Sequence, residues 1–180
     1  MTATAERYVT HLAEVFGRDP GRRAAARRSL GRPVNDPMTR RADAVVARWL
    51  PENRSTATEA AYYTVAALIA TQPKGSEEGS PGPGNLGHTL GLAVRDKGLN
   101  PDGIEKRLHL LCRQDVRGVH RQLPALIRQL TGAGLQPDWA GLLLDLGGWD
   151  RRRDQITKRW LQAFYRAANP VNDVQESENQ

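Results

Sequence analysis

The residues of this chain that could do chemistry are mainly arginines, and their spacing places several of them on one side of a helix. Toward the carboxyl end, five cations share a predicted helical face and no acid lies among them: Arg151, Arg152, Lys158, Arg159 and Arg166. A guanidinium group is planar and donates paired hydrogen bonds, which suits phosphate oxygens. A surface made only for solubility normally mixes both signs of charge. This face therefore favours anion binding over simple solvation.

Two more arginine pairs, Arg22-Arg23 and Arg27-Arg28, lie in the Ala-rich segment GRRAAARRSL. Cations four residues apart on a helix repel each other by about 0.2–0.5 kcal/mol, so this helix gives up some stability for its basic side. The whole chain has 26 Lys and Arg residues against 20 Asp and Glu residues, a formal charge of +6. Such a surplus suggests an anionic partner, most often nucleic acid, with a solvated basic surface as the alternative.

The residue types that usually carry catalysis or bind metals do not form a pattern. His11, His88, His109 and His120 are scattered, with no pair at the spacing of metal ligands on one helix. The single cysteine, Cys112, lies on an apolar stripe, which suits a structural thiol better than a nucleophile. Neither a Gly-rich phosphate loop nor a cluster of carboxylates is found. The sequence therefore predicts a protein that is not an enzyme and uses no metal or cofactor.

The elements that position the cations are predicted to be helices, because apolar residues recur at spacings of three and four and no segment alternates like a strand. In the first half we expect helices over residues 6–16, 21–30, 37–50 and 56–69. The last of these would start at a capping box, Thr56-x-x-Glu59. Its run of Ala, Val and Leu predicts the buried centre of the first half.

In the second half, Asn100-Pro101 is a typical helix start, since Asn caps free N–H groups and Pro fits the first helical position. The helix that follows has an apolar stripe on one side and cations on the other. Asp115 can cap the next helix, which Pro124 should kink or divide into two short helices. Two further helices are expected over residues 138–146 and 149–168, and Gly87-x-x-x-Gly91 has the spacing of a helix-packing site.

The predicted fold class is all-α, with two small helical bundle domains joined by a Gly/Pro-rich linker or loop. Residues 71–85 are rich in Gly, Pro and Ser and lack apolar periodicity, although a long loop within one domain is the close alternative. We therefore expect domains over residues 1–84 and 85–168, followed by a disordered acidic tail over 169–180. Without an apolar run of about 18 residues or a hydrophobic leader, the protein is expected to be cytoplasmic and to have no membrane partner.

The second half resembles the CasB family, the small subunit of the type I-E CRISPR Cascade complex. The likeness is carried by the runs LGHTLGLA, GIEKRLHLLCR, LPALIRQL and PDWAGLLLDLGGWDRRRDQITKRW. The first half agrees more loosely, through GRRAAARRSL and a Trp-Leu-Pro-Glu-Asn-Arg segment before an Ala-rich helix. The resemblance spans roughly residues 6–168. The Gly/Pro-rich segment and the acidic tail differ or vary, and no function is assigned to them.

The resemblance implies a helical, non-enzymatic subunit with two small domains and no cofactor. It implies that two copies of the chain sit as a pair against the backbone subunits that carry the crRNA. Their positive surface would steady the target strand and the displaced, non-target DNA strand after the guide has paired. Because R-loop formation is a nearly balanced exchange of base pairs, modest contacts to the nucleic-acid backbone can shift it.

The basic positions that match the family pattern are Arg27, Arg28, Arg54, Arg107, Arg113, Arg128, Arg151 and Arg152. The helical face of the last helix adds Lys158 and Arg159, with Arg166 beyond them. Weaker candidates are Arg22, Arg23, Lys106 and Arg121. For each arginine, a solvated or subunit-contacting role is the alternative, and Arg107 could instead pair with an acid of its own domain.

Two other functions are compatible with the same residues. A protein–protein scaffold could use its basic faces to dock acidic subunits while having little affinity for DNA. A helical, sequence-specific DNA-binding regulator would need a recognition helix with base-reading side chains. The residues from Arg151 to Arg166 could imitate such a helix, but no tight helix-turn-helix spacing precedes them.

Overall fold

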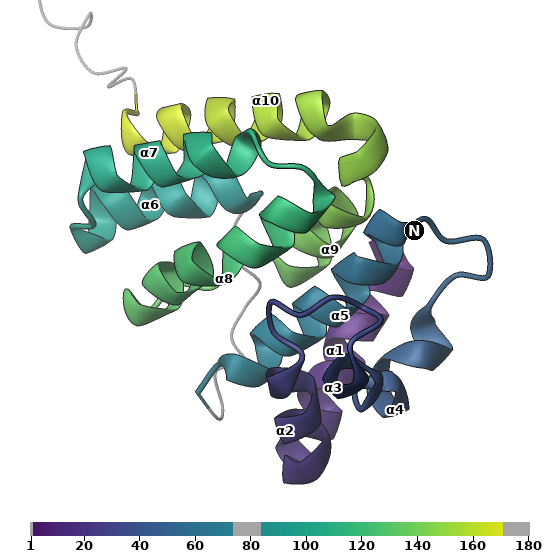
Figure 1. Ribbon diagram of the computed structural model, residues 1–180. Coiled ribbons are helices and arrows are strands. Elements are labelled where there is room, and N and C mark those ends of the chain that lie inside the picture. The colour runs from purple at the N-terminus through teal and green to yellow at the C-terminus, as the bar shows by residue number, and fades with distance from the viewer. Residues whose placement is uncertain (1, 74–83, 171–180) are drawn as a thin grey trace, which may run out of the picture.

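The fold, seen in a computed structural model that describes residues 2–73 and 84–170, is all-α, as the sequence predicts (Figure 1). Within these ranges the chain forms α-helices and one short 3-10 helix, and no strand. Their bounds are α1 Thr2–Arg18, α2 Pro20–Arg28, α3 Pro37–Arg40, α4 Asp43–Val46, η1 Ala47–Trp49, α5 Thr56–Thr71, α6 Leu86–Lys97, α7 Pro101–Cys112, α8 Val116–Gly132, α9 Trp139–Gly147 and α10 Trp149–Ala168. Among the helices of the described ranges, none has the length and apolarity that crossing a bilayer requires.

Several helices begin at the short polar residues from which the sequence predicts them. The Asn100 side chain accepts a hydrogen bond from the Gly103 N–H at 2.7 Å, and Asp115 accepts one from the Gly118 N–H at 2.7 Å. Such a bond satisfies one of the N–H groups that the first turn of a helix leaves free. The same chemistry, from Asp19, begins α2.

The start of α5 differs by one residue from the prediction. Ser55 is the cap, because its Oγ accepts a hydrogen bond from the Thr58 N–H at 3.2 Å, and Thr56 is already helical. The predicted capping box at Thr56 is therefore wrong. Glu59 is not a capping partner of Thr56 but pairs with Arg54 at 3.2 Å. The helix itself is buried as predicted, with Val65, Ala66 and Leu68 at 1% exposure or less.

The single helix expected over residues 37–50 is also wrong, since this segment forms α3, α4 and η1 in succession. Between α3 and α4 the chain turns, and the Ala42 N–H bonds to the Thr39 carbonyl only three residues back, at 2.8 Å. Leu50 then adopts an extended conformation (φ −68°, ψ 128°). Because Pro51 follows it, the helical conformation is disfavoured at Leu50.

Two glycines of α6 allow its backbone to lie directly against that of α10. A Cβ atom at Gly87 would come within 1.8 Å of the Trp160 carbonyl oxygen, and one at Gly91 within 2.6 Å of the Phe164 carbonyl oxygen. Only glycine permits so close an approach, and the helix-packing role predicted for this spacing is confirmed. The contact fixes which side of α10 is buried, with Trp160 and Phe164 inward, and therefore which side faces solvent.

The long helices α8 and α10 differ from the predictions made for them. α8 runs from Val116 to Gly132 with Pro124 inside it, so the division into two helices is not seen. α10 contains an unexpected break at Arg152, whose backbone is not helical (φ −129°, ψ 20°). The first turn of α10 is bonded to the segment between α7 and α8, because the Trp149 indole N–H donates to the Gln114 carbonyl oxygen at 3.0 Å.

α9 joins the two ends of the molecule. Figure 1 shows α6, α7 and α10 together at the top, α1–α5 at the lower right and α9 between these groups. α9 packs against α1 and α5, and the Thr58 hydroxyl of α5 donates to the Gly147 carbonyl oxygen at 3.1 Å. One cluster of buried apolar residues reaches from α1 to α10. The boundary near residue 84 and the two-domain arrangement stay predictions, and most of the proposed linker (74–83) and tail (171–180) lies outside the described residues.

Candidate nucleic-acid interface

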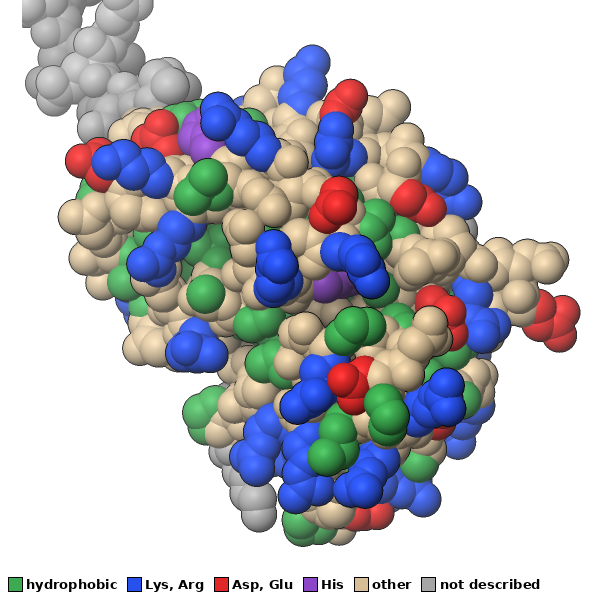
Figure 2. All heavy atoms as spheres, in the orientation of Figure 1, with side chains coloured by type: hydrophobic (Ala, Val, Ile, Leu, Met, Phe, Trp, Pro, Cys, Tyr) green, Lys and Arg blue, Asp and Glu red, His purple; other side chains and the backbone are tan. Residues whose placement is uncertain are grey.

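All of the predicted site residues are exposed, but they lie on several helices. α2 carries Arg27 and Arg28, and Arg54 precedes α5. Figure 2 shows Lys and Arg side chains gathered most densely at the lower end of this face, where Figure 1 places α2 and α3, and spread more widely elsewhere. The remaining predicted residues are Arg107 and Arg113 at α7, Arg128 on α8, and Arg151, Arg152, Lys158 and Arg159 on α10.

The main part of α10 carries an open groove that brings three of these residues together. This groove has a volume of about 460 Å³ and a buried Ile156 beneath it. Its other lining residues are Arg152, Gln155, Lys158, Arg159 and Gln162. Guanidinium, ammonium and amide groups all donate hydrogen bonds, so the groove is rich in donors for phosphate oxygens. We call it the α10 groove.

One acid borders the α10 groove, and it comes from the preceding helix. Nη2 of Arg159 donates to Oδ1 of Asp145 at 2.5 Å, and the Trp160 indole N–H donates to Oδ2 at 2.7 Å. Burial raises the pKa of Asp145, while the bonds to Trp160 and Arg159 act in the opposite direction. The expectation of an acid-free face is therefore wrong at Arg159.

Arg152 packs against Gly148, four residues earlier in the chain. A Cβ atom at Gly148 would come within 2.5 Å of Nη2 of Arg152, so the guanidinium lies directly on the Gly148 backbone. The break in α10 at Arg152 separates this residue from the regular helix that follows. No ion pair of Arg152 or Lys158 is found in the parts of the chain that the structure describes.

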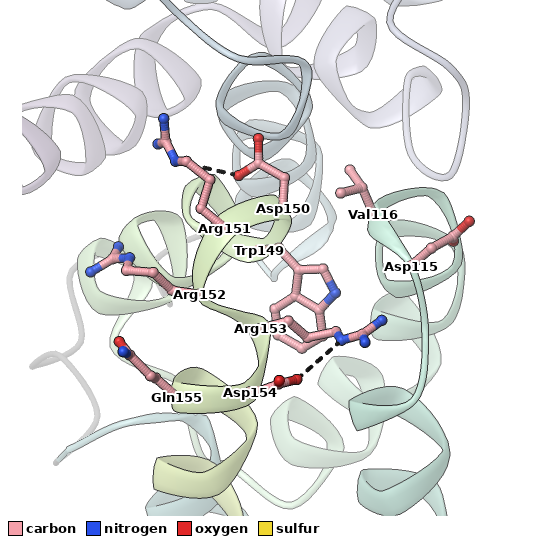
Figure 3. A pocket seen from close by; sticks show the side chains of 9 residues that line it. All are labelled: Asp115, Val116, Trp149, Asp150, Arg151, Arg152, Arg153, Asp154 and Gln155. Carbon is pink, nitrogen blue, oxygen red and sulfur yellow. Dashed lines mark ion pairs between the residues drawn. The ribbon is translucent and has the colours of Figure 1, made fainter.

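Arg151 lines a second hollow, of about 590 Å³, which contains both arginines and acids (Figure 3). Arg151 pairs with Asp150 at 3.7 Å, and Arg153 pairs with Asp154 at 3.7 Å. Figure 3 shows Arg153 pointing toward Asp115 and Val116, whereas Arg152 points away from them. Because this hollow has carboxylates beside its guanidinium groups, it is a poorer phosphate site than the α10 groove.

α8 carries a line of cations that the sequence analysis only partly selected. Arg117, Arg121 and Arg128 are exposed and lie within about 40° of one another around the helix. The helix contains no Asp or Glu, and the acid before it, Asp115, caps its N-terminus. Within the described residues none of the three has an ion pair. We call this line the α8 stripe.

α7 packs beside α8 and adds the predicted residues Arg107 and Arg113. Both are exposed, and the described part of the chain offers no ion pair for either. The intradomain acid considered for Arg107 is therefore not found there. Between these two positions, Leu110 is 53% exposed, which is high for a large apolar side chain.

The arginines of α2 have different roles. Arg23 is buried, and its guanidinium donates to the Ala70 carbonyl oxygen at 3.2 Å and to the Gln72 carbonyl oxygen. These groups end α5, where a cation is favoured by the helix dipole, so Arg23 has a structural role. Arg22 pairs with Asp19 at 3.2 Å. Arg27 and Arg28 stay exposed.

The other chemistry-bearing residues do not assemble into a site. Within the described residues no group of three or more His, Cys, Asp and Glu side chains could hold a metal ion. Burial raises the pKa of Cys112 to about 11, which keeps the thiol protonated and suits a structural residue. Burial also lowers the pKa of His120 to about 4.

Comparison with known proteins identifies the family. Residues 22–165 match the family described as CRISPR-associated protein Cse2. The chain belongs to the Cse2 family. Its structure is similar to a chain of a CRISPR RNA-guided surveillance complex, with 37% identity, 93% of this chain and 94% of the other covered, and a TM-score of 0.84. CasB from Thermus thermophilus is similar at 25% identity, with 89% and 97% covered and a TM-score of 0.69. No curated protein is significantly similar.

The Cse2 assignment confirms the resemblance to CasB and agrees with the prediction of a non-enzymatic protein, because the family is that of a structural subunit. All of the predicted site residues lie within the matched range, whereas Arg166 lies just outside it. The sequence analysis missed Asp145, which no spacing along α10 could reveal, and Arg117. The regular spacing of arginines on an acid-free helix was the available signal for Arg117.

Proposed function

We propose that this Cse2-family protein is a non-enzymatic subunit of a Cascade surveillance complex that binds nucleic-acid backbones without reading their sequence. The proposal is supported by the likeness to chains of CRISPR RNA-guided surveillance complexes. The single observation that carries the binding role is the set of exposed cations on the α8 stripe and in the α10 groove, most of them without a described acid partner. Contacts of this kind position a strand but do not distinguish bases.

In this role the cations stabilise the target strand and the displaced strand of the R-loop. The RNA–DNA duplex that forms is about as stable as the DNA duplex that it replaces. A few phosphate contacts therefore suffice to shift the balance toward the open form. Reading of the sequence is left to the crRNA, which explains why a surface of arginines and glutamines is enough.

The proposed partners are the backbone subunits that carry the crRNA, both DNA strands and a second copy of this chain. The mixed-charge hollow around Arg151 and Arg153 suits a protein partner better than a phosphate chain, because it presents acids as well as bases. Co-purification with crRNA-loaded backbone subunits, followed by R-loop assays with and without this chain, tests the assembly. Failure to co-purify would contradict it.

A salt titration tests the nucleic-acid contacts. If about six phosphates are neutralised, log K should fall against log salt with a slope of about −4 to −5, from roughly 0.7 per contact on single strands to 0.9 on duplex. Filter binding from low to high salt measures the slope. A flat response would exclude the electrostatic contacts.

Charge reversal tests the same contacts within the complex. Arg151→Glu with Arg152→Glu should weaken R-loop stability while helicity, measured by circular dichroism, stays unchanged. Unfolding of the double variant would assign these residues to the structure instead.

A protein–protein scaffold is the second candidate, and the mixed-charge hollow favours it. It predicts tight binding to a backbone subunit and negligible affinity for free DNA. A sequence-specific regulator would differ from both, because an excess of random duplex would not displace the DNA that carries its preferred site from the protein. Binding assays with the isolated protein and random duplex competitor therefore separate the three functions.

A further inference from the structure

Asp145 lies beside the α10 groove and contacts its lining residue Arg159. Its side chain is 10% exposed, while that of its partner Arg159 is 55% exposed. Both carboxylate oxygens are used, one by Arg159 and one by the Trp160 indole. The acid therefore reaches the groove from below, through its contact with Arg159.

The groups that hold Asp145 are themselves fixed. Trp160 is fully buried, its ring lies 5.2 Å from that of Trp149, and its backbone lies against Gly87 of α6. Since Trp160 cannot turn away without disturbing these contacts, the carboxylate keeps its position. Arg159 stays beside it as long as the carboxylate is ionised.

This arrangement changes how many cations the α10 groove can offer to a phosphate chain. A guanidinium that is already neutralised by a carboxylate holds few counterions, so binding a phosphate there releases few. Arg152 and Lys158 have no ion pair in the described ranges of the chain. The wild-type groove therefore acts with two cations, although three line it.

We infer that Asp145 limits the affinity of the α10 groove for nucleic-acid backbones by holding Arg159 in an ion pair. The inference rests on the proposed function and adds a control on the same site. A groove restrained in this way binds arbitrary strands weakly and holds a strand only when the rest of the complex presents it. Asp145 is thus an affinity-setting residue that makes no contact with the strand.

The test is a salt titration of the full chain on an oligothymidine. Asp145→Asn keeps the size of the side chain and an acceptor for Trp160 but removes the charge. The variant should bind more tightly at low salt, and its slope should steepen by about 0.7, the contribution of one further phosphate contact on a single strand. An unchanged or shallower slope would overturn the inference.

Two further variants keep the result specific. Asp145→Asn combined with Arg159→Gln removes the ion pair without changing the net charge. The salt slope of this double variant should equal that of the wild type. It can be measured even where Asp145→Asn alone fails to fold. A slope shallower by about 0.7 would mean that Arg159 contacts the strand, against the inference. Asp102→Asn removes an exposed acid of α7 that has no ion pair in the described residues and lies outside the groove. A gain equal to that of Asp145→Asn would indicate a general charge effect instead.

The proposed function has its own control in this experiment. Arg152→Gln with Lys158→Gln should make the slope shallower by about 1.4 on a single strand. If this pair has no effect, the α10 groove does not bind nucleic acid and the proposed function fails at this site. If the pair has its effect but Asp145→Asn does not, only the role of Asp145 is wrong.

Discussion

The α8 stripe and the basic face of α10 look alike in the sequence but differ in the folded molecule. On α8, the described structure shows no acid paired with Arg117, Arg121 or Arg128. On α10, by contrast, Arg151, Arg153 and Arg159 all have acidic neighbours within 4 Å. The charge available to a ligand thus depends on the neighbouring helix as well as on the helix that carries the cations.

The undersides of the two regions differ as well. Beneath α10, the buried Asp145 has a partner for each of its oxygens. On the inner side of α8, His120 is 9% exposed, and neither ring nitrogen has a hydrogen-bond partner in the described residues. A buried polar group without a partner costs stability. The polar group beneath α10 therefore holds a cation of its surface in place, whereas the one on α8 makes no hydrogen bond within the described residues.

The largest expected effect concerns the support of α10. Gly87→Ala should destabilise the protein by about 3 kcal/mol or more, since the added methyl group would meet the Trp160 backbone. Gly132→Ala, at the end of α8, is the matched control because nothing lies within 4 Å of its Cβ. That change should be neutral or stabilising by up to about 1 kcal/mol. Chemical denaturation of both variants measures the difference, and equal stabilities would contradict the packing described for α6.

The next effect concerns the two sets of arginines. Arg117→Gln, Arg121→Gln and Arg128→Gln together should make the salt slope on single-stranded DNA shallower by about 2, or roughly 0.7 per contact. Arg151→Gln with Arg153→Gln should change it by much less per residue, because both arginines already have acidic neighbours. Equal losses per residue would erase the distinction between the α8 stripe and α10.

The smallest effect at neutral pH concerns His120. His120→Leu, which conserves volume, should stabilise the protein by about 1 kcal/mol because it removes a buried group without a partner. Thermal denaturation at pH 7 measures the change. A loss of stability would indicate that the ring nitrogens have a role in the fold.

The same variant has a distinct pH dependence. The pKa of His120 is lowered to about 4 by burial, so between pH 6.5 and 4 the unfolded chain binds more protons than the folded one. Stability should therefore fall as the pH drops through this window, by at most about 3 kcal/mol from this residue. His120→Leu should flatten that fall, and an unchanged pH profile would contradict the buried, neutral state.

Much of the fold could be predicted because its signals are local. Asn100, Asp115 and Asp138 mark helix starts by chemistry that acts within one turn. The glycines of α6 were recognisable by spacing alone, although the sequence did not show that α10 is their partner. Two local predictions failed by small margins, at Ser55 and in the segment that forms α3, α4 and η1.

The site was harder to predict because charge is shared between elements that are distant in the sequence. Arg23 belongs to the same basic segment as Arg27, yet it is buried against the end of α5. There it donates to the carbonyl oxygen of Ala70, which lies 47 residues later in the sequence. Arg159 meets Asp145 across 14 residues and a change of helix. No helical spacing contains such information. The basic face of one helix therefore does not by itself give the charge that a ligand meets.

The glycine at position 87 also has a meaning for other members of the family. A relative with any side chain at the equivalent place must hold the two helices farther apart, because its Cβ could not coexist with the carbonyl group found here at 1.8 Å. Whether a relative has glycine at this position therefore indicates, from its sequence alone, whether α6 and α10 can lie as close together as they do here. In relatives without this glycine, α10 would be displaced from the protein interior, and its exposed cations would move with it.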